Sequence, residues 1–393
     1  MKLKSLATGL LVTTGLGIGG YYLYENNSGF KMNVDKLISN FYSEDSIISV
    51  DTFRLESAKD SLIYSEKKTS TKVVSKKIPP FSQYKKLDDY AKNAPSNVAT
   101  DITTLANYLI KPAQNEMEKT RLLFSWIAFH VKYDDVGYNT NKYGDLTAEG
   151  VLKSRKAVCE GFANLFKSLA SSAGLKAEKI SGYAKGYAYK TGQDFTKANH
   201  AWNAINIDGK WKLFDVTWAQ GYGDTKNGKL VSKVQFDDYW FDTHPKEFIF
   251  THFPEVQTWQ LLTSQLTLKQ YETLPYVGKE FFKYGFKNDY TLKNALGGVI
   301  LQFVEAYALK FPLKVISVPY KKEIEENKVY DLKIESNYAE QIALINNGDW
   351  IYFSKEGNIF TLQAKPKKGE MSISVKNNPQ DKDFETVLQY DVK

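Results

Sequence analysis

Apolar residues recur at helical spacing between about residues 96 and 175. One helix is expected in SNVATDITTLANYLI and a second in NEMEKTRLLFSWIAFHVKYDD. A third is expected at the end of this region, where apolar residues recur at i, i+3, i+4, i+7 and i+11 from Phe162 onward. Gly174 is a typical residue for the end of that helix. The pattern therefore predicts a helical region ahead of the first strands.

The pattern changes to strands after residue 175. Three strands are expected, at about 176–189, 200–207 and 211–218. Asp208 and Gly209 read as the turn of a hairpin between the last two strands. Residues 237–283 are expected to be helical and loop-like, and short alternating runs beyond about residue 285 predict a small β-sandwich.

The N-terminal segment has the pattern of an export signal. Lys2 and Lys4 precede an uncharged run from Ser5 to Tyr24, which is about 20 residues long and near the length needed to cross a bilayer. The lysines predict that the N-terminus stays cytoplasmic and that the remainder is exported. A cleaved signal peptide is the alternative, although no A-x-A site ends the run. We expect an extracytoplasmic protein that is either membrane-anchored by this segment or secreted.

The composition is that of a folded protein with a modest positive charge. Hydrophobic residues make up 42% of the chain and aromatic residues 14%, which is enough to build hydrophobic cores. The net charge of +7 is interpreted as a slightly basic, solvated surface. Neither an arginine-rich stripe nor a nucleic-acid-binding module is recognisable, so nucleic acid is not an expected partner.

Cys159 is the one cysteine of the chain. A single thiol cannot form an intramolecular disulfide and cannot build a zinc site alone. Cys159 lies one turn ahead of Phe162, so the N–H groups and dipole at the start of the expected helix would favour its thiolate form. A cysteine near a helix start is also typical of a small buried residue. The residues expected near Cys159 distinguish an activated thiol from a small buried residue.

The expected hairpin brings a histidine and an aspartate to one face of the sheet. A two-residue loop pairs Ile207 with Lys210, and the same register places His200 opposite Thr217. Cross-strand partners share a face, so His200 and Asp215 are diagonal neighbours within side-chain reach. A histidine, oriented by a carboxylate, is what an activated cysteine nucleophile requires.

The stretches that carry these residues resemble the transglutaminase-like superfamily of thiol enzymes, which has a papain-like architecture. They are KAVCEGFANLFKSLASSAGLKAEKISGYAKG and NHAWNAINIDGKWKLFDVTWAQG. The later stretch YWFDTHPKEFIFTHFPEVQTWQLL resembles the extension of the kyphoscoliosis-peptidase-like branch, so that the resemblance covers about residues 100–265. It implies that Cys159 is the nucleophile, that His200 is the general base and acid, and that Asp215 is the orienting carboxylate.

The resemblance and the patterning together predict an α+β protein. Its papain/transglutaminase-like core would pack the helix that carries Cys159 on an antiparallel sheet, and a C-terminal β-sandwich-like domain would follow. The expected parts are an N-terminal membrane anchor or signal segment at 1–30, a linker or N-terminal extension at 31–95, a transglutaminase-like catalytic domain at 96–283 and a β-rich domain at 284–393.

The resemblance implies attack on an amide through a thioester intermediate. A water acceptor would make the protein a peptidase or amidase, and a lysine amine would make it a transglutaminase. The alternative, from a different functional class, is a non-catalytic scaffold or binding module at the cell envelope. The expected partners are a protein or peptide substrate and cell-envelope components.

The sequence does not call for a metal ion or an organic cofactor. His244 and His252 lie eight positions apart without supporting carboxylates or thiols, so a metal site is not expected there, and His252 is interpreted as a structural residue. The backbone N–H of Cys159 is the usual oxyanion donor in sites of this kind, and the sequence does not assign a second donor.

Overall fold

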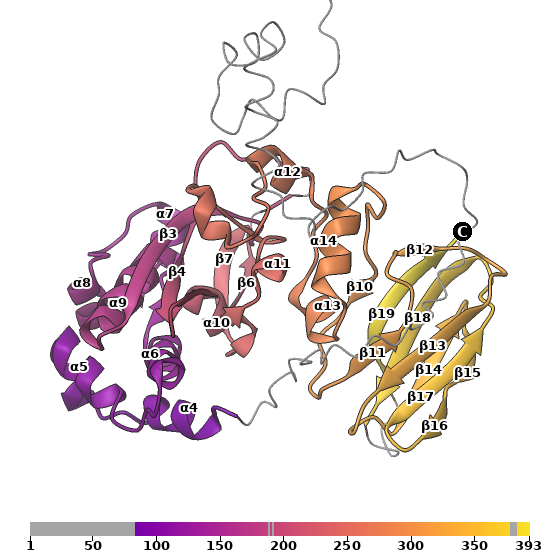
Figure 1. The fold of residues 1–393 in the computed structure, drawn as a ribbon, viewed down its shortest axis with the longest axis horizontal. Helices are drawn as coiled ribbons and strands as arrows, with labels where there is room; N and C mark the ends of the chain where they lie inside the picture. The colour runs from indigo at the N-terminus through magenta and orange to yellow at the C-terminus, as the bar shows by residue number, and fades with distance from the viewer. Residues whose placement is uncertain (1–82, 188, 191, 378–382) are drawn as a thin grey trace, which may run out of the picture. The chain divides into compact units, whose positions relative to one another are not determined.

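The computed structural model describes residues 83–187, 189–190, 192–377 and 383–393 (Figure 1). The expected N-terminal anchor or signal segment, and the linker up to residue 82, lie outside the described residues. Among the residues that are described, none of the helices combines the length and the apolar character needed to cross a membrane.

Helices make up the first described part of the chain. They are α4 (Lys85–Lys92), α5 (Ile102–Leu109), α6 (Glu116–His130), α7 (Asp135–Thr140), α8 (Ala148–Ser154) and α9 (Cys159–Ser172). Asn115 begins α6 by accepting the backbone N–H of Glu118 through its side chain, as expected of an asparagine N-cap. Two short strands, β1 (Lys132–Tyr133) and β2 (Lys156–Ala157), pair in parallel beside these helices.

An antiparallel sheet of five strands follows in the order β8-β5-β4-β3-β9. Its strands are β3 (Lys176–Ala184), β4 (His200–Ile207), β5 (Lys210–Phe214), β8 (Phe241–Thr243) and β9 (His252–Pro254). Helix α9 packs on β3 and β4 (Figure 1), with Phe162 and Phe166 in the same hydrophobic core as Trp202. The expected core, in which the helix carrying Cys159 lies on an antiparallel sheet, is confirmed.

The hairpin register agrees with the sequence, but the second strand ends early. Ile207 pairs with Lys210, and the turn residues Asp208 and Gly209 have φ of 50° and 79°, as a two-residue turn with two left-handed positions requires. The strand stops at Phe214, not at residue 218. The reason is local, because Asp215 caps the next helix, α10 (Val216–Gln220), by accepting the N–H of Trp218.

Two further expectations about the strands and helices are corrected. Strand β3 ends at Ala184 and not at residue 189, because the side chain of Asn199 takes over as its partner: Oδ1 accepts the N–H of Ala184 at 2.7 Å and Nδ2 donates to its carbonyl at 3.1 Å. Within the region beyond residue 285 that was expected to be strands, Asn288–Leu296 forms helix α14.

An exposed hairpin, for which no element was expected, follows α10 as β6 (Gly221–Lys226) and β7 (Lys229–Val234). Residues 237–283, which were expected to be helical and loop-like, contain three short helices, α11 (Pro245–Phe248), α12 (Leu268–Thr273) and α13 (Lys279–Lys283). They also supply two strands of the central sheet, β8 and β9, which the expectation missed.

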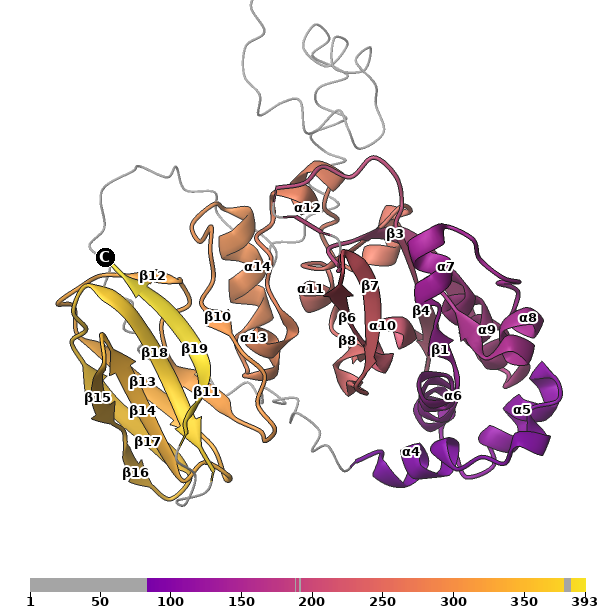
Figure 2. The ribbon, with the colours of Figure 1, turned by 180° about the vertical axis from the view of Figure 1, so that it is seen from behind.

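The C-terminal strands form two sheets that face each other (Figure 2). One contains β10 (Glu305–Ala306), β12 (Glu323–Ile324), β14 (Gln341–Asn346), β15 (Asp349–Tyr352), β18 (Gly369–Lys376) and β19 (Glu385–Val392). The other contains β11 (Lys314–Ser317), β13 (Tyr330–Glu335), β16 (Ser354–Glu356) and β17 (Ile359–Ala364). Alternate residues such as Ile334 and Ile373 are fully buried in one shared core, which is the packing of the expected β-sandwich.

Candidate active site

Cys159 is the first residue of helix α9. The preceding residue, Val158, has extended backbone and offers no side-chain cap to the helix start. The first N–H groups of a helix have no partner within the helix and carry the positive end of its dipole. The thiol is partly exposed. Cys159 is therefore accessible from solvent at the start of a helix.

His200 and Asp215 form a close pair at the end of the hairpin. Nε2 of His200 lies 2.6 Å from Oδ2 of Asp215, and the two side chains are only 7% and 0% exposed. The other carboxylate oxygen, Oδ1, accepts the N–H of Trp218 at 2.9 Å. The cap of helix α10 therefore also holds the carboxylate that faces His200.

The imidazole of His200 lies between Asp215 and Cys159. Because Asp215 engages Nε2, Nδ1 is the ring nitrogen left for a further partner, and Cys159 is among the groups that raise the pKa of His200. The structure thus brings together all three residues that the sequence singled out, and these three are called the thiol cluster below.

The charged forms of His200 and Asp215 stabilise each other. Burial acts to lower the pKa of His200, but the charge of Asp215 and hydrogen bonds to Asp215 and Cys159 outweigh burial and raise it. Burial acts to raise the pKa of Asp215, and the interactions with His200 and His252 hold that pKa well below its usual range. A buried carboxylate next to a charged imidazolium is the arrangement that stabilises a thiolate.

His252, which the sequence interpretation treated as structural, also reaches the cluster. Its Nε2 lies 3.0 Å from Oδ2 of Asp215, and its side chain is fully buried. It comes from β9, which pairs with β3 so that Ala184 lies opposite His252. Sequence reasoning missed this contact because β9 is only three residues long and its partner lies far back in the chain.

His200, Asp215 and His252 are also a group that could hold a metal ion. Their ligand atoms lie within 4.8 Å of one another. The same atoms, however, are hydrogen-bonded among themselves, with Oδ2 of Asp215 shared by both rings. An imidazole and a carboxylate that satisfy each other in this way fit the orientation of a catalytic histidine without a metal.

The charge of Cys159 acts on two tyrosines. Burial, and then the charge of Cys159, raise the pKa of the half-buried Tyr133, and Cys159 also contributes to the raised pKa of Tyr138. Tyr138 meets Tyr187 edge to face, with ring centroids 6.5 Å apart, and Tyr187 is 42% exposed. The Tyr187 hydroxyl lies 2.6 Å from Oγ1 of Thr225 on β6. Tyr138 and Tyr187 are therefore in ring contact, and Tyr187 reaches the surface.

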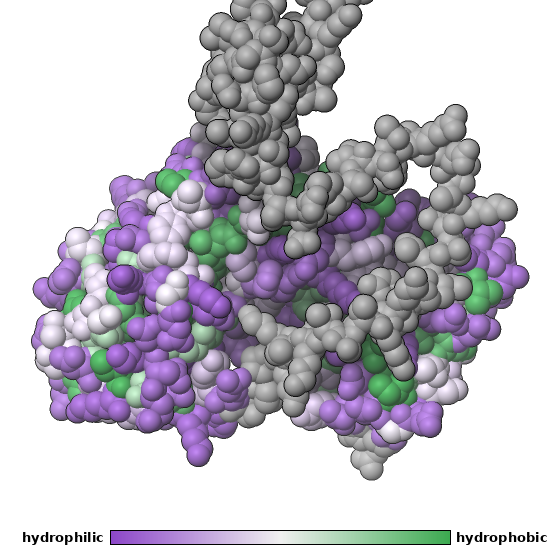
Figure 3. Space-filling model, viewed as in Figure 1, coloured by the Kyte–Doolittle hydropathy of each residue, from purple (hydrophilic) through white to green (hydrophobic). Residues whose placement is uncertain are grey.

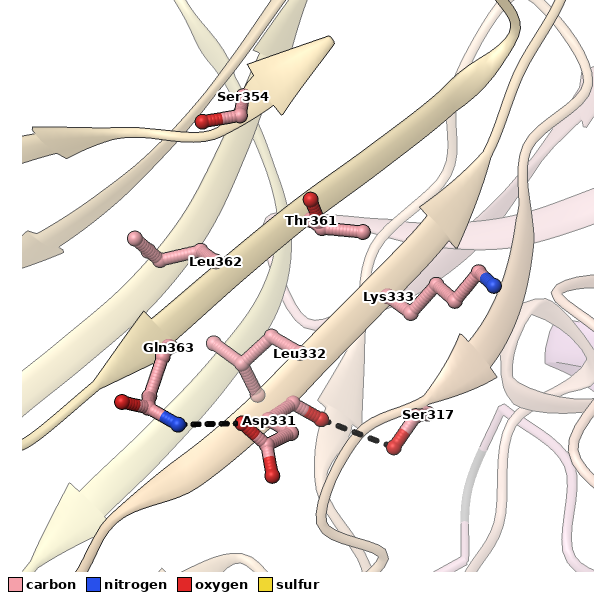
Figure 4. A pocket seen from close by; sticks show the side chains of 8 residues that line it. All are labelled: Ser317, Asp331, Leu332, Lys333, Ser354, Thr361, Leu362 and Gln363. Carbon is pink, nitrogen blue, oxygen red and sulfur yellow. Dashed lines mark hydrogen bonds between the residues drawn. The ribbon is translucent and has the colours of Figure 1, made fainter. Parts of the chain in front are cut away.

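A hollow in the β-sandwich lies on different elements from the thiol cluster. It measures about 450 Å³ and lies over β13 and β17, with Lys333, Thr361 and Gln363 among its lining residues (Figure 4). Its polar groups bond to each other, as Gln363 does to Asp331 at 2.9 Å. On the molecular face in Figure 3, hydrophilic residues predominate and apolar ones are scattered.

Residues 103–216 match the family model of the transglutaminase-like superfamily. The chain is 33% identical over 233 residues to kyphoscoliosis peptidase of Homo sapiens, covering 59% of this chain and 34% of that protein. It is 31% identical over 215 residues to hillarin of Drosophila melanogaster, covering 52% of this chain and 26% of that protein. The chain thus spans about a third of the length of the first relative.

Among solved structures, a putative cysteine protease from Cytophaga hutchinsonii aligns at 23% identity over 35% of this chain and 42% of that one, with a TM-score of 0.24. The family match alone places a transglutaminase-like domain in this chain. The matched range contains Cys159, His200 and Asp215, whereas His252 lies beyond it.

Proposed function

We propose that the transglutaminase-like domain of this chain is a thiol enzyme in which Cys159, His200 and Asp215 attack an amide carbonyl. The observation that carries the proposal is the position of the His200 ring. One of its nitrogens is held at 2.6 Å by a buried carboxylate, and the other is left to the thiol at the start of α9. A structural histidine would not need both contacts at once.

The geometry supports a two-step acyl transfer. Proton transfer from Cys159 to Nδ1 of His200 gives a thiolate–imidazolium pair, and the thiolate attacks the amide carbon. The backbone N–H of Cys159 lies where it can donate to the developing oxyanion. The imidazolium then protonates the leaving amine, the C–N bond breaks and a thioester remains.

The second step uses the same histidine as a base. Nδ1 of His200 takes a proton from the acceptor as it attacks the thioester, and the thiolate leaves. Water as the acceptor completes amide hydrolysis, and a primary amine completes cross-linking. Asp215 stays ionised throughout and stabilises each imidazolium that forms.

We further propose that the substrate is a protein or peptide outside the cytoplasm. The reason lies in the chain's own N-terminal pattern, with two lysines before a long uncharged run. Fractionation of cells that express the full chain, followed by detection of the protein outside the cytoplasmic fraction, tests this. Recovery in the cytoplasm alone would contradict it.

The catalytic proposal is tested by thiol alkylation at pH 5.5 and pH 8. An activated Cys159 reacts with iodoacetamide at the lower pH, and His200→Ala reacts much more slowly there. If both proteins show the slow, steeply pH-dependent reaction of an ordinary thiol, the domain is a non-catalytic scaffold.

The acceptor is tested with a glutamine-bearing protein and a labelled primary amine. Incorporation that is lost in Cys159→Ala identifies amine transfer. Deamidation or cleavage without incorporation, also lost in Cys159→Ala, identifies a hydrolase.

A further inference from the structure

A second, fully buried histidine contacts the carboxylate of the thiol cluster. Oδ2 of Asp215 lies 2.6 Å from Nε2 of His200 and 3.0 Å from Nε2 of His252. We propose that His252 is a positioning residue, a neutral imidazole that fixes the Asp215 carboxylate so that His200 keeps Nδ1 turned to Cys159. This inference rests on the proposed thiol chemistry and adds a fourth member to that site.

Hydrogen-bond accounting fixes the tautomer of His252. An ionised carboxylate only accepts, so the Nε2 of His252 that faces Asp215 must carry the hydrogen. In a neutral ring, Nδ1 is then an acceptor, and the atom beside it is Oγ1 of Thr251 at 2.8 Å. The Thr251 hydroxyl also lies 3.3 Å from the carbonyl oxygen of Phe248, but with a neutral ring its one hydrogen goes to the nearer acceptor, Nδ1. The hydrogen bond at Nδ1 of His252 therefore runs from the Thr251 hydroxyl to the ring.

The backbone of Thr251 is anchored in turn. Its carbonyl accepts the N–H of Lys185 at 2.9 Å and the hydroxyl of Tyr271 at 2.9 Å. The hydroxyl that orients His252 therefore comes from a segment tied to the end of β3 and to helix α12. Such support is what holds a contacting side chain in one rotamer.

Aromatic rings enclose the imidazole of His252. Phe248 stacks on it with centroids 4.0 Å apart, and Trp218 lies at 4.3 Å on a tilted plane. Trp202 and Trp240 complete the enclosure, at 5.2 Å and 5.4 Å. In this environment burial dominates and lowers the pKa of His252 to about 4, and the ionisable groups that act on it are Asp215 and His200. The ring is therefore a neutral donor at neutral pH.

The consequence concerns the fully buried carboxylate. Asp215 accepts one bond at Oδ1, from the N–H of Trp218, and two at Oδ2, from the two rings. Three donors fix the rotation of the carboxylate and stabilise its charge. When the His252 donor is removed, the charge that stabilises the His200 imidazolium is weaker, and the thiolate beside that imidazolium is less favoured.

The experiment measures alkylation of the full chain with iodoacetamide at pH 5.5 and 8.5. An ordinary thiol of pKa about 8.5 loses about 500-fold in thiolate between these values. We expect the wild-type rate to change much less. His252→Phe keeps a ring among the aromatic side chains but removes the donor, and should lose at least about tenfold in rate at pH 5.5. His252→Gln, which can present an N–H to Oδ2, should recover most of that rate.

Two further variants separate positioning from stability. Thr251→Val removes the hydroxyl that bonds Nδ1 of His252 and should lower the rate at pH 5.5 by a smaller factor. The ring of His130 bonds the carbonyl of Trp126. His130→Gln should therefore leave the rate unchanged. Thermal unfolding of each variant reports folding, because a purely structural His252 would lower the melting temperature without altering the ratio of the two rates.

The outcomes distinguish the two proposals. If the wild type reacts at low pH and His252→Phe, still folded, keeps the same ratio, His252 is not a positioning residue and the thiol chemistry stands. If the wild type itself shows the 500-fold loss of an ordinary thiol, the proposed function fails, and this inference fails with it. If His252→Phe does not fold, Thr251→Val decides: a folded variant with the wild-type ratio of the two rates means that His252 is not a positioning residue.

Discussion

The side chain of Asp215 accepts the backbone N–H of Trp218 at 2.9 Å, so the residue that begins helix α10 is also the one that holds His200. A capping carboxylate at a helix start is stabilised in its charged form by the helix dipole and the free N–H groups. The position of the charge in the thiol cluster is thus set by the secondary structure itself.

Asp215→Asn should strongly reduce the reactivity of the Cys159 thiol while leaving the helix cap in place. Asparagine is an equally good N-cap, but it removes the charge that stabilises the His200 imidazolium. We expect the alkylation rate at pH 5.5, and any amidase or transfer activity, to fall on the order of 10²–10⁴-fold.

The matched control is Asp208→Asn on the same hairpin. Asp208 is a turn residue with φ of 50°, a conformation that asparagine also adopts. Its alkylation rate should equal that of the wild type. Equal loss in both variants would mean that the hairpin, and not the Asp215 charge, is being perturbed.

His252 predicts a specific pH dependence of stability. Its pKa in the folded protein is lowered to about 4, below the value of about 6.5 in the unfolded chain. As the pH falls from 7 towards 4.5 the unfolded chain takes up the proton first, so this site loses stability in that range. The difference in unfolding free energy between the wild type and His252→Gln should therefore shrink as the pH is lowered, as urea denaturation at each pH would show. A difference that grows on acidification would contradict a neutral His252.

Arg121 should contribute strongly to the stability of the helical part. Its side chain is 2% exposed, and its Nε and Nη2 bond both oxygens of Asp88 at 2.7 and 2.8 Å. Its guanidinium also lies 4.9 Å from the ring centre of Tyr84. Arg121→Met should cost about 3 kcal/mol of unfolding free energy, because it removes the charged partner of the partly buried Asp88 carboxylate and leaves it the hydroxyl of Ser125.

An exposed ion pair nearby provides the control for Arg121. Lys85 pairs with Asp89 four residues on, and both side chains are more than half exposed, at 67% and 54%. Lys85→Met should change the unfolding free energy by less than about 0.5 kcal/mol. Similar values for the two variants would show that burial does not decide the contribution of the Arg121 pair.

Gly182→Ala should separate β9 from β3. A Cβ at this position would lie 2.3 Å from the carbonyl oxygen of Phe253 and 2.5 Å from the indole of Trp202, so backbone must move. We expect a loss of about 1–3 kcal/mol in unfolding free energy, together with slower alkylation at pH 5.5, because His252 moves with β9. Gly144→Ala, where nothing lies within 4 Å of the new Cβ, should change neither quantity.

The hairpin shows how far local sequence can determine a site. Asp208 and Gly209 specify a two-residue turn, the turn fixes the register, and the register brings His200 and Asp215 to one face. The same reasoning predicts a strand at Thr217, where the structure has a helix. The prediction is wrong because Asp215 begins that helix, which ends the strand pairing.

The contribution of His252 could not be predicted by the same means. The contact depends on a strand of three residues, His252–Pro254, that pairs with β3 across a long separation in sequence. Neither periodicity nor turn chemistry reports such a pairing. The sequence therefore suggests only His244 as a partner for His252 in a metal site, and His244 instead caps helix α11 through its side chain.

The pairing of β9 with β3 also determines what counts as the smallest complete unit of this protein. A fragment that ends near residue 245 would contain every residue of the thiol cluster and the whole stretch that matches the family model. It would lack the strand that closes one edge of the sheet and the donor that this strand brings to Asp215. Such a fragment would leave the Asp215 carboxylate with two of its three donors, His200 and the N–H of Trp218.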